Sequence, residues 1–313
     1  MTLSLEEQLR LSIEIAKARM TAIDEAKGMA AIAEAKATAV KGGELFIMPS
    51  PAAPPLDSEI PSRLSPSSVN CFGDCSARWF YRKVLKLPET RGAALGLGTA
   101  VHHALIENFR QKIETHIDLP AEDVRGLFVG ALCDELDSGL KLLAGESADD
   151  LKESGEVMVR VYMDQAAPQV QPAAIEEHVE GLIGGVPVHG YIDVRTIEGR
   201  VIDIKTAKRK PTGITPAHRL QAGTYVLLHP EASGEATIST LTKTKTVSLQ
   251  QDSMTILPPD RKLIEKLYSI TRDQMQTGLV APNRASFLCG KYCSFKGRCA
   301  DDYGGTFAPE VEA

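Results

Sequence analysis

The segment 190–206 contains acidic and basic side chains whose spacing could support hydrolysis of a phosphodiester. Asp203 and Lys205 are two residues apart in an expected strand, so both point to the same face of that strand. If Asp193 joins them, the two carboxylates repel each other unless one is protonated or a cation neutralises them. Such oxygen ligands suit Mg²⁺ or Mn²⁺, and Lys205 could then orient a water molecule and offset developing charge. The alternative is a surface hairpin with an ordinary Asp–Lys ion pair.

The turn between the two expected strands decides whether Asp193 reaches Asp203. A two-residue loop, 198–199, would place Asp193 opposite Ile204, on the wrong face. A three-residue loop, 197–199, ends instead with Gly199 in the left-handed position of a β-bulge. That register pairs Asp193 with Asp203 and gathers the apolar residues of both strands on one face, and register follows the buried face. Those apolar residues are Ile192, Val194, Ile202 and Ile204. We therefore predict the three-residue loop.

Further motifs surround this hairpin in a fixed order along the chain. They are Leu64–Ser68 (LSPSS) with Cys75 and Arg78–Tyr81 (RWFY), Gly98–His102 (GTAVH), Gln221–Tyr225 (QAGTY) and a closing group of cysteines. Together with Asp193 and the sequence Asp203-Ile204-Lys205, this set resembles the PD-(D/E)xK nuclease superfamily over residues 64–300, and within it the RecB-family exonucleases. The resemblance implies an α/β, restriction-endonuclease-like core. Such a core is a central mixed sheet flanked by helices, here with a helical insertion and an N-terminal helix.

The resemblance also implies a divalent-ion site, for Mg²⁺ or Mn²⁺. Its ligands would be His102, Asp193, Asp203 and the main-chain carbonyl of Ile204. His103 is the nearest competitor of His102, and the spacing from Gly98 favours His102. Taken without the resemblance, His102 could equally be a core histidine.

The remaining roles implied by the resemblance fall on three residues. Lys205 would be the catalytic lysine. Gln221 and Tyr225 are four residues apart, so they share one face of an expected helix and would orient DNA or the active-site groups. Ordinary helix packing is the alternative explanation for these two.

Three cysteines near the C-terminus, Cys289, Cys293 and Cys299, have the spacing C-x3-C-x5-C. Three sulfurs need a fourth ligand to close a metal site, and the family motif supplies Cys75. Cys71 could compete with it, whereas Cys133 is expected in the core. Chemistry alone leaves zinc and a [4Fe–4S] cluster equally open. The resemblance, to the iron–sulfur subset that includes the CRISPR-associated RecB-like nucleases, favours [4Fe–4S]. Either metal would join residue 75 to the C-terminal loop.

Periodicity and turn residues predict the elements that must position these groups. Helices are expected at about 65–85, 96–116, 121–144, 148–166, 215–229 and 259–277, and strands at 174–183, 186–196 and 200–206, with a further strand or hairpin within 235–249. Ser65-Pro66 and Thr215-Pro216 are expected helix starts, because each pairs a hydroxyl N-cap with proline in the first turn.

The chain is expected to divide into four parts. They are an N-terminal helix (1–41), a proline-rich linker (42–64), a RecB-like nuclease domain with the C-terminal cysteine cluster (65–303), and a tail (304–313). Within the N-terminal helix, residues 4–41 carry a heptad-like apolar stripe. This stripe could pack on its own domain, mediate self-association or bind a protein partner.

Composition narrows the functional class further. The net charge of −6 excludes a strongly basic nucleic-acid-coating protein, but not a local basic groove. Basic groups lie near the proposed site at Arg78, Arg82, Lys83, Lys86, Lys208, Arg209, Lys210, Lys291, Lys296 and Arg298. No apolar run is long enough to span a membrane, and acidic residues interrupt any signal peptide. We therefore expect a cytoplasmic protein that does not enter a membrane.

The resemblance and the residues together predict a Mg²⁺- or Mn²⁺-dependent deoxyribonuclease, a phosphodiester hydrolase. An exonuclease on single strands or DNA ends is expected, acting in DNA repair, recombination or phage DNA processing. The alternative is a non-catalytic DNA-binding subunit of a recombination complex. The intact set of Asp193, Asp203 and Lys205 argues against that alternative.

Overall fold

The computed structural model describes residues 60–142, 145–243 and 246–307. The chain divides into two compact units, Met1–Ala52 and Ala53–Ala313, and every described residue belongs to the second. The predicted N-terminal helix therefore lies outside the described residues, as does most of the predicted linker.

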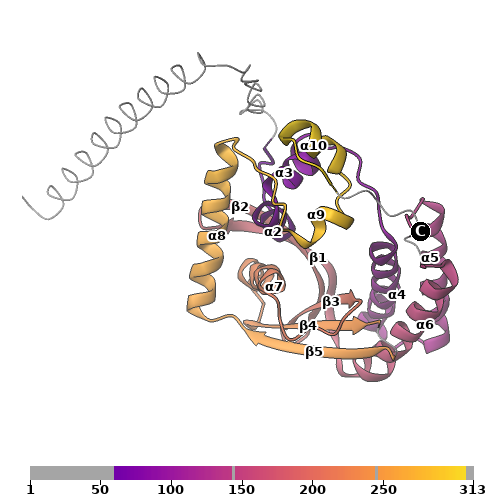
Figure 1. Ribbon diagram of the computed structural model, residues 1–313. Coiled ribbons are helices and arrows are strands. Elements are labelled where there is room, and N and C mark those ends of the chain that lie inside the picture. Colours follow the sequence, from indigo (N-terminus) through magenta and orange to yellow (C-terminus); the bar gives the residue numbers. More distant parts are fainter. Residues whose placement is uncertain (1–59, 143–144, 244–245, 308–313) are drawn as a thin grey trace, which may run out of the picture. The chain divides into compact units, whose positions relative to one another are not determined.

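The centre of the described unit is a five-stranded sheet in the order β1-β2-β3-β4-β5 (Figure 1). The strands are β1 (Pro172–Ile183), β2 (Val186–Thr196), β3 (Val201–Ala207), β4 (Glu235–Thr242) and β5 (Ser248–Thr255). Strands β3 and β4 are parallel, whereas the other neighbours are antiparallel. The sheet is therefore mixed, and the predicted fold class is confirmed.

Helices cover both faces of the sheet. They are α2 (Pro66–Asp74), α3 (Ser76–Trp79), the π-helical turn η1 (Phe80–Val84), α4 (Ala93–Thr115), α5 (Ala121–Asp137), α6 (Ala148–Gln165), the short η2 (Ala167–Gln169), α7 (Pro216–Leu228), α8 (Pro258–Gln276), α9 (Phe287–Lys291) and α10 (Lys296–Tyr303). Figure 1 shows α7 and α8 on one side of the molecule and α4, α5 and α6 on the other. The helices α3, α9 and α10 gather at one end.

The two predicted helix starts are confirmed. The Ser65 hydroxyl accepts a hydrogen bond from the Ser68 amide (3.2 Å), and Pro66 opens α2. Thr215 accepts in the same way from the His218 amide (3.2 Å), ahead of Pro216. These caps satisfy amides that have no partner within the helix, so sequence alone fixes where both helices begin.

The helix predicted over 65–85 is wrong as a single element. It breaks at Cys75, whose backbone is extended (φ −157°), and resumes as α3. The Cys75 sulfur then accepts from the Arg78 amide at 3.5 Å and so caps the new helix. Cys133 is also exposed rather than in the core, because its neighbour Leu132 takes the buried position of α5.

The first described residues run beside the part of β2 that does not pair with β3. Leu64 is fully buried and forms a bridge to Val188 of β2. The Arg272 guanidinium of α8 donates to the carbonyls of Pro61 and Ser62, at 2.8 and 3.0 Å. The last residues of the predicted linker therefore pack against the core.

No helix among residues 60–142, 145–243 and 246–307 is long and apolar enough to cross a membrane.

Candidate active site

The turn between β2 and β3 has the predicted three-residue form. The Thr196 amide donates to the Arg200 carbonyl (3.0 Å), which leaves residues 197–199 as the loop. Gly199 has a φ of +78°, and a Cβ there would lie 2.3 Å from the carbonyl oxygen of Glu231. Glycine is thus required both by backbone conformation and by space. The resulting register pairs Val194 with Ile202, so Asp193 lies level with Asp203 as predicted.

The prediction that four apolar residues share one face is wrong for Ile192. Val194, Ile202 and Ile204 pack in the core cluster beneath α4, but Ile192 packs with Val201 in the cluster beneath α7. The side-chain alternation of β2 therefore slips at Asp193, between the two. Such irregularities bend a strand and re-aim a side chain, and are frequent beside active sites.

The neighbouring strand is irregular at the same level. Glu176, which the β1–β2 register places opposite Asp193, has a φ of +46°, a conformation that costs energy for a residue other than glycine. Nothing in the sequence indicates this conformation, because glutamate is a common exposed strand residue. The bend in both strands brings the Asp193 carboxylate into the gap between β2 and β3.

Asp193 is held by two contacts in that gap. Its Oδ2 accepts from the Ile204 amide at 2.8 Å, and its Oδ1 lies 3.2 Å from Nε2 of His102. In a regular ladder the Ile204 amide would bond a carbonyl of β2, so the side chain replaces a strand partner. Burial would raise the pKa of Asp193. The hydrogen bond and charge of His102, with Lys205 nearby, outweigh it and hold the pKa below its ordinary value.

His102 comes from the middle of α4 and is half-buried, whereas His103 is exposed. The prediction of His102 over His103 therefore agrees with the geometry. Burial alone would lower the pKa of His102, but the hydrogen bond to Asp193 and the charges of Asp193 and Glu176 leave it raised. The 3.2 Å contact orients the His102 ring and the Asp193 carboxylate relative to each other.

Asp203 and Lys205 point together from β3, as predicted. Lys205 Nζ lies 2.9 Å from Asp203 Oδ1. Asp203 is 1% exposed, and burial raises its pKa to about 6 even though Lys205 opposes the shift. Its second oxygen, Oδ2, is buried without a hydrogen-bond partner among the described residues. A buried carboxylate oxygen without a partner is costly unless a ligand completes it.

Gln221 and Tyr225 of α7 form a pair above this gap. The Gln221 amide donates to the Tyr225 hydroxyl at 3.1 Å, and Tyr225 is buried. Burial raises the pKa of the Tyr225 hydroxyl, although the bond from Gln221 opposes the shift. The ring has room because β2 carries Gly190 there. A Cβ at that position would lie 2.4 Å from Tyr225 Cε1. The sequence motif located Gln221 and Tyr225 but not the glycine that admits the ring.

The side chains of Asp193, Asp203 and His102 do not by themselves form a complete metal-coordination site. Among residues 60–142, 145–243 and 246–307, no group of three or more His, Cys, Asp or Glu side chains lies close enough to hold a metal ion. Asp203 Oδ2 nevertheless lacks a partner among the described residues, Asp193 is near enough for its charge to raise the Asp203 pKa, and this donor chemistry suits a hard divalent cation. The residues present therefore fit Mg²⁺ or Mn²⁺, with the Ile204 carbonyl on the same strand.

The four predicted cysteine ligands line one small pocket at the end formed by α3, α9 and α10. Cys75, Cys289, Cys293 and Cys299 share it with Arg78, Tyr81 and Phe307, among others. Cys75 Sγ accepts from two backbone amides, those of Arg78 (3.5 Å) and Asn283 (3.4 Å). Burial raises the pKa of Cys293 and of Cys299, and the neighbouring thiols add to both shifts. Cys71 packs instead in the apolar cluster with Phe72 and Trp79.

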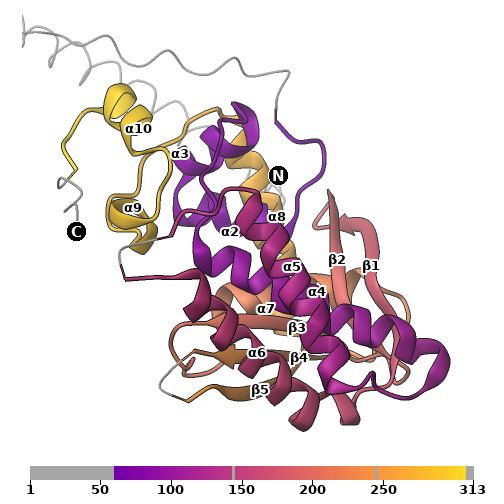
Figure 2. The same cartoon turned by 90° about the vertical axis from the view of Figure 1, so that its right-hand side faces the viewer.

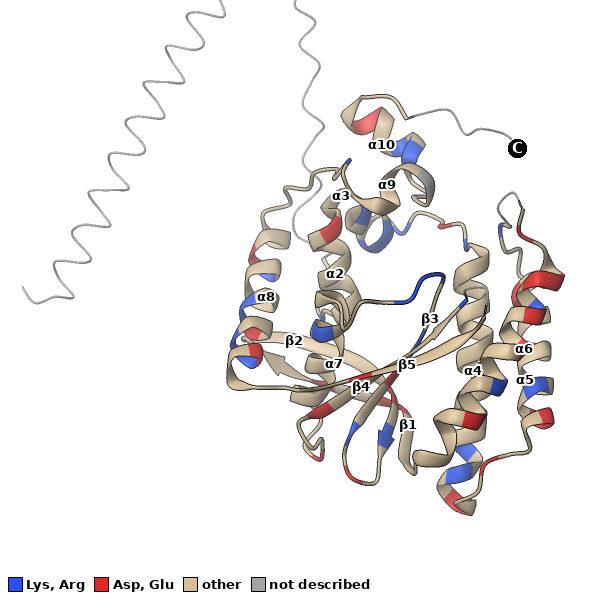
Figure 3. Ribbon diagram, turned by 60° about the horizontal axis from the view of Figure 1, so that its bottom comes forward, with Lys and Arg blue, Asp and Glu red and all other residues tan. Residues whose placement is uncertain are grey.

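One basic segment lies near the catalytic gap. Figure 3 shows the basic segment that follows β3, residues 208–210, between α7 and α4. Several of the predicted basic groups are engaged in ion pairs, such as Arg82 with Glu89 (2.8 Å) and Arg298 with Asp302 (2.8 Å). Arg209 and Lys210 are exposed.

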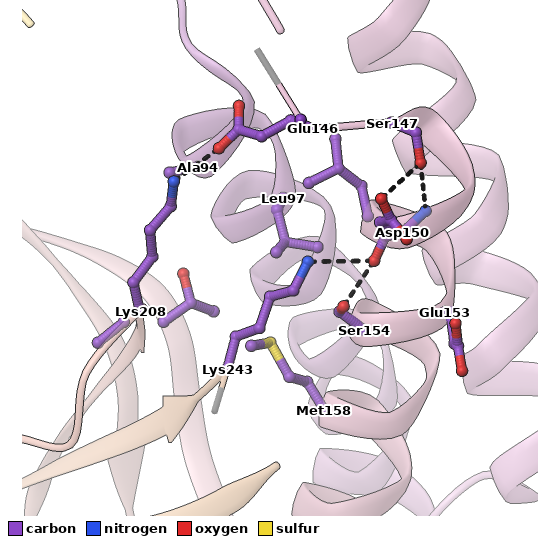
Figure 4. Close-up of a pocket in the computed structure, with 14 residues that line it drawn as sticks. Ala94, Leu97, Glu146, Ser147, Asp150, Glu153, Ser154, Met158, Lys208 and Lys243 are labelled. Carbon is purple, nitrogen blue, oxygen red and sulfur yellow. Dashed lines mark hydrogen bonds and ion pairs between the residues drawn. The ribbon is translucent and has the colours of Figure 1, made fainter. Parts of the chain in front are cut away.

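A cavity of about 280 Å³ lies beyond the end of β3 rather than over the catalytic groups. Leu97 of α4 and Met158 of α6 form part of its wall (Figure 4). Lys208 reaches Glu146 (2.6 Å) across its rim, and Lys243 reaches the main-chain oxygen of Asp150 (3.3 Å). The cavity contains none of the predicted catalytic residues, so the chemistry points to the gap between β2 and β3 instead.

Comparison with solved structures supports the fold. A crystal structure named "Putative exonuclease" from Eubacterium rectale matches with a TM-score of 0.52 and 11% sequence identity, covering 79% of this chain and 90% of that one. A protein named SSO0001 also matches, at 15% identity over 78% of this chain and 89% of that one, but its TM-score of 0.38 is too low to support an argument. Among curated proteins, no sequence matches.

A family model places the whole set of motifs in one framework. The model of the PD-(D/E)XK nuclease superfamily matches residues 63–300, which include every catalytic, ion-binding and cysteine residue discussed above. With the mixed sheet and the converging Asp193, Asp203 and Lys205, this match leads to one conclusion: the chain belongs to the PD-(D/E)XK nuclease superfamily.

Proposed function

We propose that the protein is a Mg²⁺- or Mn²⁺-dependent deoxyribonuclease. The observation that carries the proposal is the gap between β2 and β3. There Asp193 and Asp203 converge beside Lys205, and the Asp203 Oδ2 lacks a partner among the described residues. Membership of the PD-(D/E)XK nuclease superfamily supports the same chemistry.

In this proposal each residue has a distinct task. Asp193, Asp203, His102 and the Ile204 carbonyl hold the divalent ion, which when bound supplies a Lewis acid and lowers the pKa of a water molecule. His102 also keeps the Asp193 carboxylate ionised and oriented. Lys205 is positioned to offset the negative charge that develops on the phosphate oxygens. Gln221 and Tyr225 orient the substrate or Lys205 from α7.

We propose further that the substrate is a single strand or a DNA end and that digestion is exonucleolytic. The resemblance to RecB-family exonucleases favours this mode, and a role in DNA repair, recombination or phage DNA processing in the cytoplasm. The exposed Arg209 and Lys210 beside the gap suit contacts to phosphates. Residues 1–41 are the candidate surface for a protein partner or self-association.

The test is cleavage of end-labelled single- and double-stranded DNA with Mg²⁺ or Mn²⁺. Wild type should release label only when the ion is present, and Lys205→Ala should reduce the rate at least a hundredfold, because it removes the charge that stabilises the transition state. Lys262→Ala, which changes an exposed lysine of α8, is the matched control and should retain the wild-type rate. The order in which labels are released gives the polarity.

The rival function, a non-catalytic DNA-binding subunit, predicts a different result. In that case folded wild type binds DNA but cleaves neither substrate, and Asp203→Ala leaves its function unchanged. A second readout avoids dependence on activity. Mg²⁺ should raise the melting temperature of wild type by preferential binding to the folded state, but not that of Asp203→Asn.

We propose that the cysteine pocket holds a [4Fe–4S] cluster, with zinc as the less favoured occupant. The support is the donor set: four thiols line one pocket, although no three of them lie close enough among the described residues to hold a metal ion, and two backbone amides donate hydrogen bonds to Cys75 Sγ. Hydrogen bonds from backbone amides to sulfur are typical of iron–sulfur sites. The group would join α3 to the C-terminal segment and stabilise the fold.

Metal analysis of protein purified without oxygen tests this second proposal. Four iron atoms and four sulfides per chain are expected, with loss in Cys75→Ser. Cys133→Ser, which changes the exposed cysteine of α5, should retain full content. One zinc ion per chain would replace the cluster in the proposal. Iron-free, zinc-free protein that is folded and active would contradict it.

A further inference from the structure

One face of the β1–β2 ribbon carries aromatic rings that the core does not require. His178 lies directly opposite Tyr191 in the strand pairing, and their ring centroids are 5.0 Å apart. His189, one step further along β2, lies 6.2 Å from the His178 ring. The opposite face of the same strands holds Val179 and Val188, which fill the core.

These rings are open to solvent. Tyr191 is 57% exposed, His178 is exposed and His189 is half-buried. Rings that stay largely exposed gain little from burial, because most of their apolar surface remains in water, and a cross-strand ring pair contributes at most about 1 kcal/mol. Three neighbouring rings on one ribbon therefore call for an explanation other than stability.

The rings begin at the catalytic gap. Tyr191 is two residues before Asp193 on β2, so the two Cα atoms lie about 6.7 Å apart along the strand, across the slip in side-chain alternation at Asp193. His189 follows at the next such step. Figure 2 shows β1 and β2 as a two-stranded ribbon rising away from β3, β4 and β5. A chain that leaves the catalytic gap along this ribbon would meet the three rings in order.

The charged side chains near the rings are either basic or acidic groups paired with an arginine. Glu176 and Glu180, on the same face, are each paired with an arginine, Arg110 and Arg63 respectively. Burial lowers the pKa of His189, and His178 and Arg63 lower it further. The positive charge of Lys83 is close enough to His189 to lower the pKa of the imidazole.

We propose that Tyr191, His178 and His189 form a stacking platform for unpaired bases of the strand whose end enters the catalytic gap. The inference rests on the proposed nuclease function and specifies its substrate as a single strand. Aromatic rings stack on any base, so the platform gives affinity without sequence preference. Bases inside a duplex already stack on each other, so the platform favours a strand that is unpaired near the site.

Kinetics on a single-stranded oligonucleotide test the platform. Tyr191→Ala and His178→Ala should each raise KM about tenfold, since stacking on one base is of this size, while kcat changes less than twofold. Tyr191→Phe keeps the ring and should restore the wild-type KM. Ile197→Ala removes a comparably exposed apolar side chain from the β2–β3 turn and is the matched control.

A contact measurement separates stacking from indirect effects. Oligonucleotides with 5-iodouracil at successive positions are irradiated on Lys205→Ala protein, which should bind without cutting. Crosslinks to Tyr191 or His178, at positions a few nucleotides from the strand end, are expected. Crosslinks confined to other segments would overturn the platform.

The outcomes distinguish the inference from the function beneath it. If wild type cleaves DNA and both alanine variants keep the wild-type KM, the platform is wrong and the nuclease stands. If wild type neither binds nor cleaves DNA, both fail. An equal rise in KM for duplex without ends and for single strands would also overturn the preference for unpaired bases.

Discussion

At the residue scale, the positions of the site's side chains depend on small neighbouring residues. Gly190 is the clearest case, since it has no catalytic group and yet admits the Tyr225 ring. We predict that Gly190→Ala displaces this ring, breaks its bond with Gln221, and lowers stability by about 1–3 kcal/mol through overpacking. Urea unfolding measures the loss.

A matched pair of variants checks the cause. Gly73→Ala, in α2, adds a methyl group where no atom lies within 4 Å, so no loss is expected. The double variant Gly190→Ala/Tyr225→Ala should recover part of the cost, because the clash is gone. Strictly additive losses in the double variant would contradict a contact between the two residues.

Glu177 makes stability depend on pH at the residue scale. Hydrogen bonds from Arg195 (2.8 Å), opposed by burial and helped by His229, lower its pKa. A carboxylate with a lowered pKa stabilises the folded state above its unfolded pKa of about 4.3, and this stabilisation is lost as pH falls through the folded value. We predict that Glu177→Gln costs about 1–2 kcal/mol at pH 7.

Unfolding free energies between pH 3 and 7 test this sign. The difference between wild type and Glu177→Gln should shrink as the solution is acidified. Glu231→Gln removes an exposed partner of the same arginine and should cost little, since exposed ion pairs contribute little. A difference that grew towards low pH would refute the assignment.

At the scale of elements, the packing of α5 against α6 requires the Phe128 ring to lie close to the backbone of Gly155. A Cβ on Gly155 of α6 would lie 2.0 Å from the Phe128 ring of α5. We predict that Gly155→Ala destabilises the protein by about 1–3 kcal/mol, although alanine is the better helix former. Gly130→Ala on the exposed face of α5 should instead stabilise by up to about 1 kcal/mol. Thermal unfolding of both variants tests these opposite signs: the melting temperature should fall for Gly155→Ala and rise for Gly130→Ala.

Most elements could be predicted from sequence because their signals are local. Alternation located β1, β2 and β3, and hydroxyl–proline pairs located the starts of α2 and α7. The register at the β2–β3 turn followed from Gly199 and the buried face. These features depend on residues close together in the chain, which is what a single sequence displays.

The features that were missed depend on tertiary contacts. The slip at Asp193 and the bend at Glu176 break the regular alternation that any strand prediction assumes. The first helix breaks at Cys75, two residues after Gly73, and the sulfur that caps α3 is an unusual N-cap. The space that Gly190 leaves for Tyr225 joins two elements distant in sequence.

At the scale of the whole molecule, the described unit should fold without the segment before it. Leu64, paired with β2 and fully buried, is part of this unit. A chain shortened to begin at residue 53 is predicted to unfold at the full-length denaturant midpoint. One that begins at residue 65 should lose about 2–4 kcal/mol, because the core loses a leucine and β2 an edge partner.

The Ile204 amide has a consequence for spectroscopy. The Ile204 amide donates its hydrogen bond to Asp193 Oδ2 instead of to a strand carbonyl. The magnetic resonance frequency of the amide proton therefore depends on the charge density on Asp193 Oδ2. A cation arriving at the carboxylate would draw density away and shift this one amide resonance. Its frequency would therefore follow cation occupancy in the resting protein, before any substrate is added.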